Sequence, residues 1–381
     1  MESAFSGAAL RLARVYHGLA LEELGDCVGK TRQYIHKLET GQGQPTSELV
    51  QAFCGALRVM ATFFTETAGM TIAEDQVHFR GLLSTRPMIR NIALAKAEVF
   101  SRLVEVLEKE LEFPHVDIPT LVDAKNAADV ERAAELCRSE WGLGLGPISN
   151  MTRVAENAGA VVTTFRSVSR EIDATSVSAR RPIIVRNLAK ESVCRQRFDV
   201  GHEIGHFALH QGRQTGDRIT ESEANRFAGA LMVPRAMMGK LFPRPRGARL
   251  DWRAISNFKL TWKISKAAAI YRARQLDLLT EDQFRSAFIT LKRTGEAVHE
   301  REDHLIAPEP PELLYRSLEL LRKRKGITLR DIASALHVEV AFIEEFIFDA
   351  VSTSSPEGSS EISVVDLGAL RASRSPIGVT G

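Results

Sequence analysis

The sequence has no long apolar run and no paired cysteines, and each absence excludes a class of protein. No uncharged apolar segment approaches the roughly 18 residues that a membrane helix needs, and Met1 to Leu10 lacks a basic stretch followed by an apolar core. The four cysteines, Cys27, Cys54, Cys137 and Cys194, form no CxxC pair, which excludes a thiolate zinc site and a disulfide framework. We therefore expect a cytoplasmic protein with reduced thiols and no membrane contact.

An excess of charge of one sign is also missing, which limits how the chain can bind nucleic acid. Lys and Arg number 50 and Asp and Glu 48, for a formal net charge of +2. A basic coat and an acidic tail are both excluded as dominant features, so any DNA contact must be local. The 381 residues, of which 44% are apolar, suffice for two or three folded modules.

Hydrophobic spacing changes along the chain and indicates where one module ends and the next begins. Residues 4–60 have apolar positions at the spacing of short helices, and residues 90–111 form a longer amphipathic pattern that two prolines follow. Beyond residue 120, two strand-like segments, 160–162 and 182–185, precede a return to helical spacing. The predicted modules are a helical bundle over 1–70, a helical linker over 71–120, a mixed domain over 121–295, a helical region over 296–350 and a flexible tail over 351–381.

The segment His202-Glu203-Ile204-Gly205-His206 fits the pattern HExxH. On a helix its two imidazoles lie four residues apart on one face, where both can bind one tetrahedral zinc ion. Glu203 is turned about 100° away, which suits a general base that acts on a water without binding the metal. The alternative is a pair of core histidines on an ordinary helix. We predict Zn2+ as cofactor, His202 and His206 as metal ligands and Glu203 as the catalytic base.

A catalytic zinc needs a third protein ligand, and two carboxylates follow the motif. In the predicted helix from Thr220 to Pro234, Glu223 lies beside the apolar stripe. Glu221 is expected on nearly the opposite side, towards solvent. Burial therefore favours Glu223 as the third metal ligand. Its competing role is a capping box, because Thr220-x-x-Glu223 matches the signature of a helix start.

Several further motifs surround the metal pattern. They are Arg197-Phe198, Leu209-His210, Glu223-Ala224-Asn225-Arg226-Phe227-Ala228 and Leu231-Met232-Val233-Pro234. Together they resemble the ImmA/IrrE metallopeptidases over roughly residues 145–290. The resemblance implies a thermolysin-like minimal metallopeptidase domain of α+β fold, zinc bound by His202, His206 and Glu223, and a repressor protein as substrate. His78-Phe79-Arg80 and Trp141-Gly142-Leu143-Gly144 are similar to the variant of the family that carries an N-terminal DNA-binding domain.

The N-terminal stretch from Leu19 to Gly41 resembles a Cro/repressor-type (XRE) helix-turn-helix. Thr31 is placed to cap its second helix, and Tyr34, Ile35 and Leu38 are expected to face the bundle. The exposed side would then carry four residues able to read base edges and phosphates, namely Arg32, Gln33, His36 and Lys37. Residues 1–60 hold six basic and six acidic residues, so a protein-interaction or dimerisation module is the alternative.

A weaker echo of this plan follows in Leu320 to Phe348. Its expected second helix carries Glu344 and Glu345 and no basic residue, so we expect it to pack against the peptidase domain and not to bind DNA. In the Ser, Gly and Pro-rich tail, Ile362 to Leu370 is apolar enough to dock on the folded part.

The sequence thus predicts a multi-domain, mainly α protein that begins with a helix-turn-helix bundle, continues with an α+β metallopeptidase domain and ends in a helical region. Its predicted activity is endopeptidase cleavage of a repressor-like protein, with DNA or a dimer partner bound through residues 1–60. Arg226 and His210 are candidates for stabilising the oxyanion, and the strand from Pro182 to Arg186 for binding substrate by strand addition. The rival functions are a regulator whose peptidase-like domain senses without cutting, and an antitoxin or scaffold.

Overall fold

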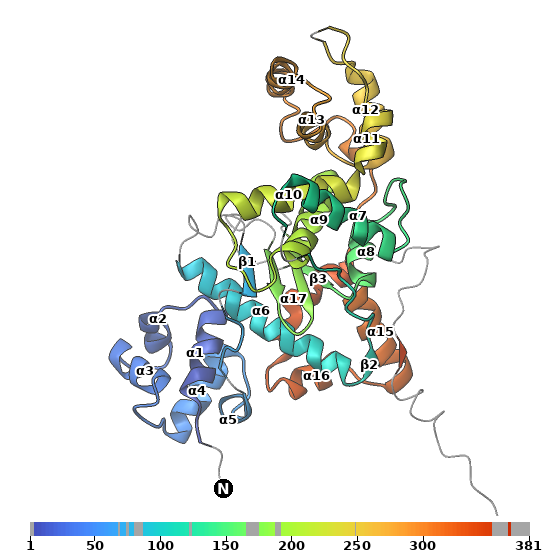
Figure 1. The fold of residues 1–381 in the computed structure, drawn as a ribbon. Helices are drawn as coiled ribbons and strands as arrows, with labels where there is room; N and C mark the ends of the chain where they lie inside the picture. The colour runs from blue at the N-terminus through green and yellow to red at the C-terminus, as the bar shows by residue number, and fades with distance from the viewer. Residues whose placement is uncertain are drawn as a thin grey trace, which may run out of the picture.

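The computed structural model describes residues 4–67, 69–73, 76–79, 87–121, 124–164, 175–186, 192–247, 249–352 and 365–366. In this part of the chain the protein is mainly helical with a small mixed sheet, which confirms the predicted fold class (Figure 1). Two parts of the chain discussed above lie outside the described residues. They are Arg80, the last residue of the motif His78-Phe79-Arg80, and nearly all of the tail. Within the tail, Val365–Asp366 forms strand β6, which pairs with β2 (Leu111–Glu112).

The remaining elements follow one another along the chain. The helices up to the sheet are α1 (Gly7–Tyr16), α2 (Leu21–Cys27), α3 (Arg32–Glu39), α4 (Ser47–Leu57), α5 (Phe63–Glu66), α6 (Pro87–Glu108), α7 (Ala127–Glu140) and α8 (Met151–Asn157). The helices after the sheet are α9 (Val193–Leu209), α10 (Arg218–Met232), α11 (Arg235–Leu241), α12 (Trp252–Trp262), α13 (Lys266–Gln275), α14 (Glu281–Arg293), α15 (Leu313–Lys325), α16 (Leu329–Ala335) and α17 (Val340–Ser352). The strands of the main sheet are β1 (Val77–Phe79), β3 (Val161–Thr164), β4 (Thr175–Ser178) and β5 (Pro182–Arg186).

Helices α2 and α3 form the predicted helix-turn-helix. Thr31 caps α3 as expected, because its hydroxyl oxygen accepts a hydrogen bond from the backbone N–H of Tyr34 at 3.3 Å. At the start of α2, where Ala20 has no side-chain oxygen to offer, the Glu23 carboxylate accepts the Ala20 N–H at 2.6 Å. Both helix starts therefore have a local partner for a backbone donor that the helix itself leaves free.

The C-terminal helices pack against the sheet of the predicted peptidase domain, as expected, and also against the N-terminal helices. They share an apolar core with α1, α4, α5 and α6. The ring of Phe342 in α17 stacks on that of Tyr16 at 4.0 Å, and the Tyr16 hydroxyl donates to the Phe342 carbonyl at 2.5 Å. The same core includes Val161 of β3 and Ile183 of β5, and both α15 and α17 contact β3.

Helix α6 is part of this core and not a linker between modules. It runs through the centre of the molecule, with α1 on one side and α16 near its far end (Figure 1). Its apolar stripe, including Leu94, Phe100 and Leu103, is buried. The buried Lys96 on the same helix binds Glu345 of α17 at 2.5 Å. The ion pair compensates a charge that would otherwise be costly to bury.

The main sheet has the strand order β1-β4-β5-β3. Strands β3 and β5 confirm the two predicted strands and pair in parallel, whereas β1 and β4 run antiparallel to their neighbours and were not predicted. Strand β5 lies inside the sheet between β4 and β3. The expectation that Pro182 to Arg186 binds substrate by strand addition is therefore wrong, because both of its edges are already paired.

A second apolar core holds α7 to α14 together and places α9 against α10. Gly205 on α9 allows the close approach, since a Cβ at this position would lie 3.1 Å from Cδ1 of Phe227 and 3.3 Å from Cα of Ala224. The facing surface of α10 carries the small side chains of Ala224 and Ala228, which also allow the two helices to approach closely. Side chains that flank these small residues on the two helices are thereby brought within contact distance.

Candidate metal centre

Helix α9 carries the HExxH segment in its last three turns, with both histidines facing inwards. His202 and His206 are each 1% exposed, and their Nε2 atoms lie 3.1 Å apart. The predicted pairing of the imidazoles on one helix face, turned to the domain interior, is present in the structure. Two ring nitrogens so close together, with no acceptor between them, are arranged to share one positive centre.

The third group near these imidazoles is Glu221 of α10. One of its carboxylate oxygens lies 3.5 Å from Nε2 of His202 and the other lies 3.5 Å from Nε2 of His206. The three candidate donor atoms all lie within 4.8 Å of one another. Burial raises the pKa of Glu221, but the two imidazoles outweigh it and hold the pKa below its usual range. The donor set is two imidazoles and one carboxylate, a set typical of catalytic zinc.

Glu223, the residue expected in this place, lies elsewhere. Its Oε2 accepts a hydrogen bond from Nε2 of His210 at 2.9 Å. Residues advance by about 100° along a helix, so Glu221 and Glu223 lie on opposite flanks of the apolar stripe of α10, each roughly 80° from its centre. Glu221 is therefore not on the far side from the stripe, and the flank that carries it is the one that faces the histidines.

The alternative role of Glu223 as half of a capping box is also wrong. Helix α10 starts three residues earlier than the box requires, with Asp217 as its cap. Oδ1 of Asp217 accepts the backbone N–H groups of Ile219 at 2.7 Å and Thr220 at 3.1 Å. Thr220 is buried inside the first turn, and its backbone N–H already donates to Asp217. It therefore has no backbone donor left for the Glu223 carboxylate.

Hydrogen bonds fix which nitrogen of each imidazole faces the cluster. The amide oxygen of Asn225 can only accept, so Nδ1 of His202 donates to it at 3.0 Å and Nε2 faces the cluster. Burial lowers the pKa of His206 to about 3, so that ring is neutral. Asn225 follows Glu221 by four residues, and this spacing on α10 matches the spacing of the two histidines on α9.

The corresponding bond of His206 runs through a second histidine. The Glu223 carboxylate is an acceptor, so Nε2 of His210 must donate to it, and Nδ1 of neutral His210 must accept. That Nδ1 lies 2.9 Å from Nδ1 of His206, which therefore donates. The chain Glu223–His210–His206 leaves Nε2 of His206 with its lone pair directed to the cluster. Both ring nitrogens of His210 are thus already hydrogen-bonded. His210 is therefore unsuited to the oxyanion role predicted for it.

Glu203 lies on the adjacent flank of α9 and is 1% exposed. Burial raises the pKa of its carboxyl group to about 7, against the opposing effects of His202 and of a hydrogen bond from Ser176. The Ser176 hydroxyl on β4 donates to Oε2 of Glu203. Sequence reasoning missed Ser176, since no local pattern connects a strand residue to a helix that follows 27 positions later.

His78 is a second residue of this region that the sequence did not assign a role. Its ring stacks on that of His206 with centroids 5.1 Å apart and an interplanar angle of 6°. Nδ1 of His78 lies 2.8 Å from the Thr215 hydroxyl oxygen and Nε2 lies 3.0 Å from the Ser178 hydroxyl oxygen. Strand β1 thereby connects the segment after the helix-turn-helix to the histidines. Arg226, the other oxyanion candidate, points to Glu131 of α7, 3.2 Å away.

The predicted DNA-reading residues share the exposed face of α3. Arg32, Gln33, His36 and Lys37 are exposed, while Ile35 and Leu38 are buried in the bundle as expected. Tyr34 is half-buried. The acidic Glu39 at the end of the helix is withdrawn from this face by a bidentate ion pair with Arg14, at 2.6 and 2.9 Å. The balanced charge count of residues 1–60 therefore understates how basic this one surface is.

Comparison with known proteins identifies two parts of the chain. A family model described as IrrE N-terminal-like domain matches residues 155–274, and one described as Helix-turn-helix domain matches residues 7–62. Both agree with the architecture predicted from the sequence. No helix in the described ranges is long and apolar enough to cross a membrane.

Individual relatives and solved structures match very different shares of the chain. The protein called Transcriptional regulator ClgR, from two strains of Mycobacterium tuberculosis, is 33% identical over 70 residues, which are 18% of this chain. The chain spans 62% of the length of these curated relatives. A crystal structure of Bacillus thuringiensis PlcR in complex with a peptide and DNA aligns over 91% of this chain and 96% of its own, at 12% identity and a TM-score of 0.15.

Proposed function

Because residues 155–274 form an IrrE N-terminal-like domain and residues 7–62 a helix-turn-helix domain, we propose that this chain is a DNA-binding regulator with zinc-dependent endopeptidase activity. Its substrate is a regulatory, repressor-like protein. One observation supports the chemistry above all others: two imidazoles and one carboxylate converge within 4.8 Å on the two helices that the family match contains. His202, His206 and Glu221 are the residues that would hold the zinc.

The proposed reaction is hydrolysis of a peptide bond. Zinc, when bound, supplies a Lewis acid that polarises the scissile carbonyl and makes a water molecule more acidic. Glu203 accepts the proton of the attacking water and transfers it to the nitrogen of the leaving amine as the C–N bond breaks. Its raised pKa, about 7, suits a group that must both take and give up a proton near neutral pH.

The remaining residues orient these groups. Ser176 fixes one oxygen of Glu203 and leaves the other for the water. Asn225 fixes the ring of His202, and the Glu223–His210 pair fixes the ring of His206, so that both Nε2 lone pairs point to the metal position without rearrangement. The donor atoms are thus held by the fold before a metal arrives, and the site has a supporting hydrogen bond for every imidazole it uses.

Binding of DNA is assigned to α3. Its exposed Arg32, Gln33, His36 and Lys37 would enter the major groove, where Arg and Gln side chains can bind base edges and Lys can bind phosphates. The name of the relatives, Transcriptional regulator ClgR, agrees with this role. The chain would then bring its peptidase domain to a promoter or to a protein bound there.

A second candidate function is a regulator whose peptidase-like domain senses a signal without cutting. The low exposure of Glu203, 1%, favours it, since a substrate and its attacking water must reach the base. Purified protein loaded with zinc, incubated with the regulators encoded beside its gene and with casein, separates the two. The endopeptidase predicts a defined cleavage that phenanthroline stops and added zinc restores. Full zinc occupancy with no cleavage of any of these proteins would reject the enzyme and support the sensor.

A further inference from the structure

A cavity of about 740 Å³ lies in the helical part of the second core, apart from the metal centre. Helices α12, α13 and α14 and the segment 296–302 form its walls, and none of the three metal-site residues lines it. Its volume falls in the range of about 300–1,000 Å³ that small-molecule sites occupy. The cavity is large enough for a metabolite and too small for a folded partner.

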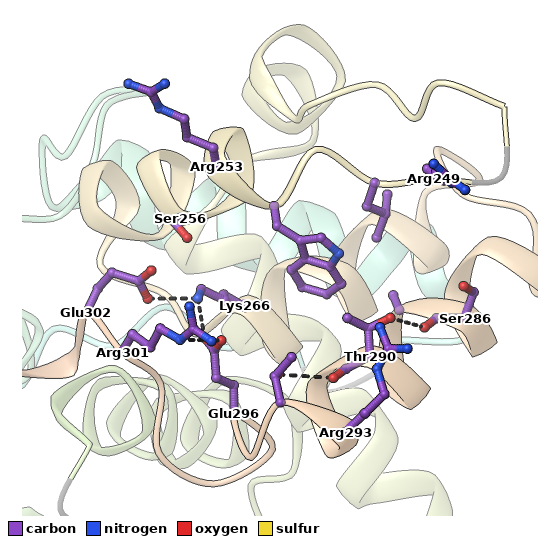
Figure 2. A pocket seen from close by; sticks show the side chains of 14 residues that line it. Arg249, Arg253, Ser256, Lys266, Ser286, Thr290, Arg293, Glu296, Arg301 and Glu302 are labelled. Carbon is purple, nitrogen blue, oxygen red and sulfur yellow. Dashed lines mark hydrogen bonds and ion pairs between the residues drawn. The ribbon is translucent and has the colours of Figure 1, made fainter.

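The charges around the cavity are unevenly distributed (Figure 2). At one side, Lys266 binds Glu296 and also Glu302, the latter at 2.9 Å, and Arg301 approaches Glu296 at 3.3 Å. Two cations pair with two carboxylates there, so that cluster is neutral, and Arg253, which also lines this side, points away from it (Figure 2). At the other side Arg293 lies beside Thr290 and Arg249 lies farther along the wall, with no acidic residue among the lining residues on that side (Figure 2).

These two arginines have no partner within the part of the chain that the structure describes. Neither guanidinium group forms an ion pair or a hydrogen bond with a described residue. Both arginines are exposed and so open to a ligand. The loop that carries Arg249 is held against α14, because Nε2 of Gln283 donates to the Gly247 carbonyl at 2.7 Å. Two fork-shaped cations on one side of the cavity, each free to move its exposed side chain, make that side suited to a doubly charged anion such as a phosphate monoester.

The cavity also has an apolar wall. Trp252, the first residue of α12, lines it together with Leu250 and Ala287. An indole is a favourable surface for stacking a planar ring. The hydroxyl groups of Thr290 and Thr294 donate to carbonyls of their own helix, at 3.0 Å each, and so offer oxygen lone pairs to the cavity. A ligand with a flat ring, hydroxyl groups and a phosphate matches all of these features.

We propose that this cavity is a binding site for a nucleoside monophosphate, with its phosphate on Arg249 and Arg293 and its base against Trp252. The proposal does not depend on the peptidase activity, since the site shares no residue with the metal centre. Helix α13, whose first residue Lys266 lines the cavity, packs on α10, which carries Glu221. The bound nucleotide would therefore lie one helix away from the helix that holds the metal.

The test is calorimetric titration of the full chain with AMP, GMP and CMP, and separately with adenosine and inorganic phosphate. We expect saturable binding of at least one monophosphate well below about 1 mM, with adenosine and phosphate each at least about tenfold weaker. Arg249→Ala combined with Arg293→Ala should weaken that binding at least about tenfold. Arg285→Ala is the matched control, because this arginine is 69% exposed on α14 and pairs with Glu281 away from the cavity, and it should change nothing.

Three results would overturn the proposal. The first is the absence of saturable binding of all three monophosphates. The second is binding that the double arginine variant leaves unchanged, given that exposed arginines can be replaced without unfolding the protein and melting curves can verify this. The third is that the double variant loses affinity for duplex DNA while no monophosphate binds, which would assign the arginines to a nucleic-acid surface.

Discussion

The Nδ1 atoms of His206 and His210 lie 2.9 Å apart, and only one of them can carry the proton between them. Because Glu223 accepts the hydrogen bond from the opposite nitrogen of His210, that proton belongs to His206. The ring that would bind the metal is thereby held in one tautomer by a carboxylate two hydrogen bonds away. Glu223 is a positioning residue of the proposed site, one step more remote than a metal ligand.

Replacement of Glu223 by Ala should therefore weaken zinc binding about 10-fold to 100-fold, while saturating zinc still loads one ion per chain. Glu223→Gln keeps an acceptor for His210, so its zinc affinity should lie between those of the wild type and Glu223→Ala. Ser222→Ala, an exposed neighbour on α10, is the control. Titration with a competing chelator gives the affinities, and the ¹⁵N shifts of His206 report its tautomer. Unchanged affinity and shifts in Glu223→Ala would remove Glu223 from the site.

Glu221→Ala should lower zinc occupancy by about an order of magnitude or more even at high zinc, since it removes a direct ligand and not a supporting contact. Glu221→Asp retains a carboxylate on a shorter stem and should recover part of the loss. Metal analysis after gel filtration measures both variants. If Glu221→Ala binds zinc as the wild type does while Glu223→Ala does not, the assignment of the third ligand is reversed.

Glu203→Gln should retain zinc and lose about 10²-fold to 10⁴-fold in cleavage rate, because the amide keeps the volume but cannot take up a proton. Ser176→Ala should reduce the rate less, since Glu203 loses only one hydrogen bond. Metal content and single-turnover cleavage are measured on the same samples. A Gln variant with full zinc and undiminished cleavage is incompatible with Glu203 as the base.

In α3, Arg32→Ala together with Lys37→Ala should weaken DNA binding and lower the slope of log K against log salt by roughly 2, about 0.9 for each lost phosphate contact. Cleavage of casein should be unaffected. The control removes two comparably exposed arginines elsewhere, Arg132 and Arg285, at 70% and 69% exposure. If the wild-type chain binds no promoter fragment at low salt, including its own, the bundle is an interaction module instead.

Glu156 should make stability fall as pH rises. Its carboxyl group is buried and accepts backbone N–H groups of Glu312 and Leu313 at 3.0 and 3.1 Å, and burial raises its pKa from 4.5 to about 8. A raised folded-state pKa means that its stabilising contribution is complete below pH 4.5 and is lost as pH rises through about 8. Glu156→Gln keeps an acceptor but does not titrate. Its melting temperature should therefore decline less from pH 5 to pH 8 than that of the wild type, and parallel declines would contradict the assignment.

The sequence predicted the histidine pair, the base and the exposed face of α3, because each depends on spacing within one helix. It chose Glu223 over Glu221 as the third ligand, because both flank the same apolar stripe and only the packing of α10 on α9 determines which flank faces the histidines. The pairing of Asn225 with Glu221 at a spacing of four was the available signal. Contacts between distant segments, such as Ser176 with Glu203, had no signal in a single sequence.

The docking of Phe342 on Tyr16 also determines the order in which the protein can fold during synthesis. These residues are separated by 326 positions, so the core around α1 is incomplete until nearly the whole chain has left the ribosome. At about 5–20 residues per second, that is a delay of roughly 15–65 seconds after Tyr16 is made. The α7–α14 core, whose residues are all made before Leu313, assembles first. A nascent chain can therefore assemble the core around the proposed metal centre before the bundle that would bind DNA has acquired its last helix.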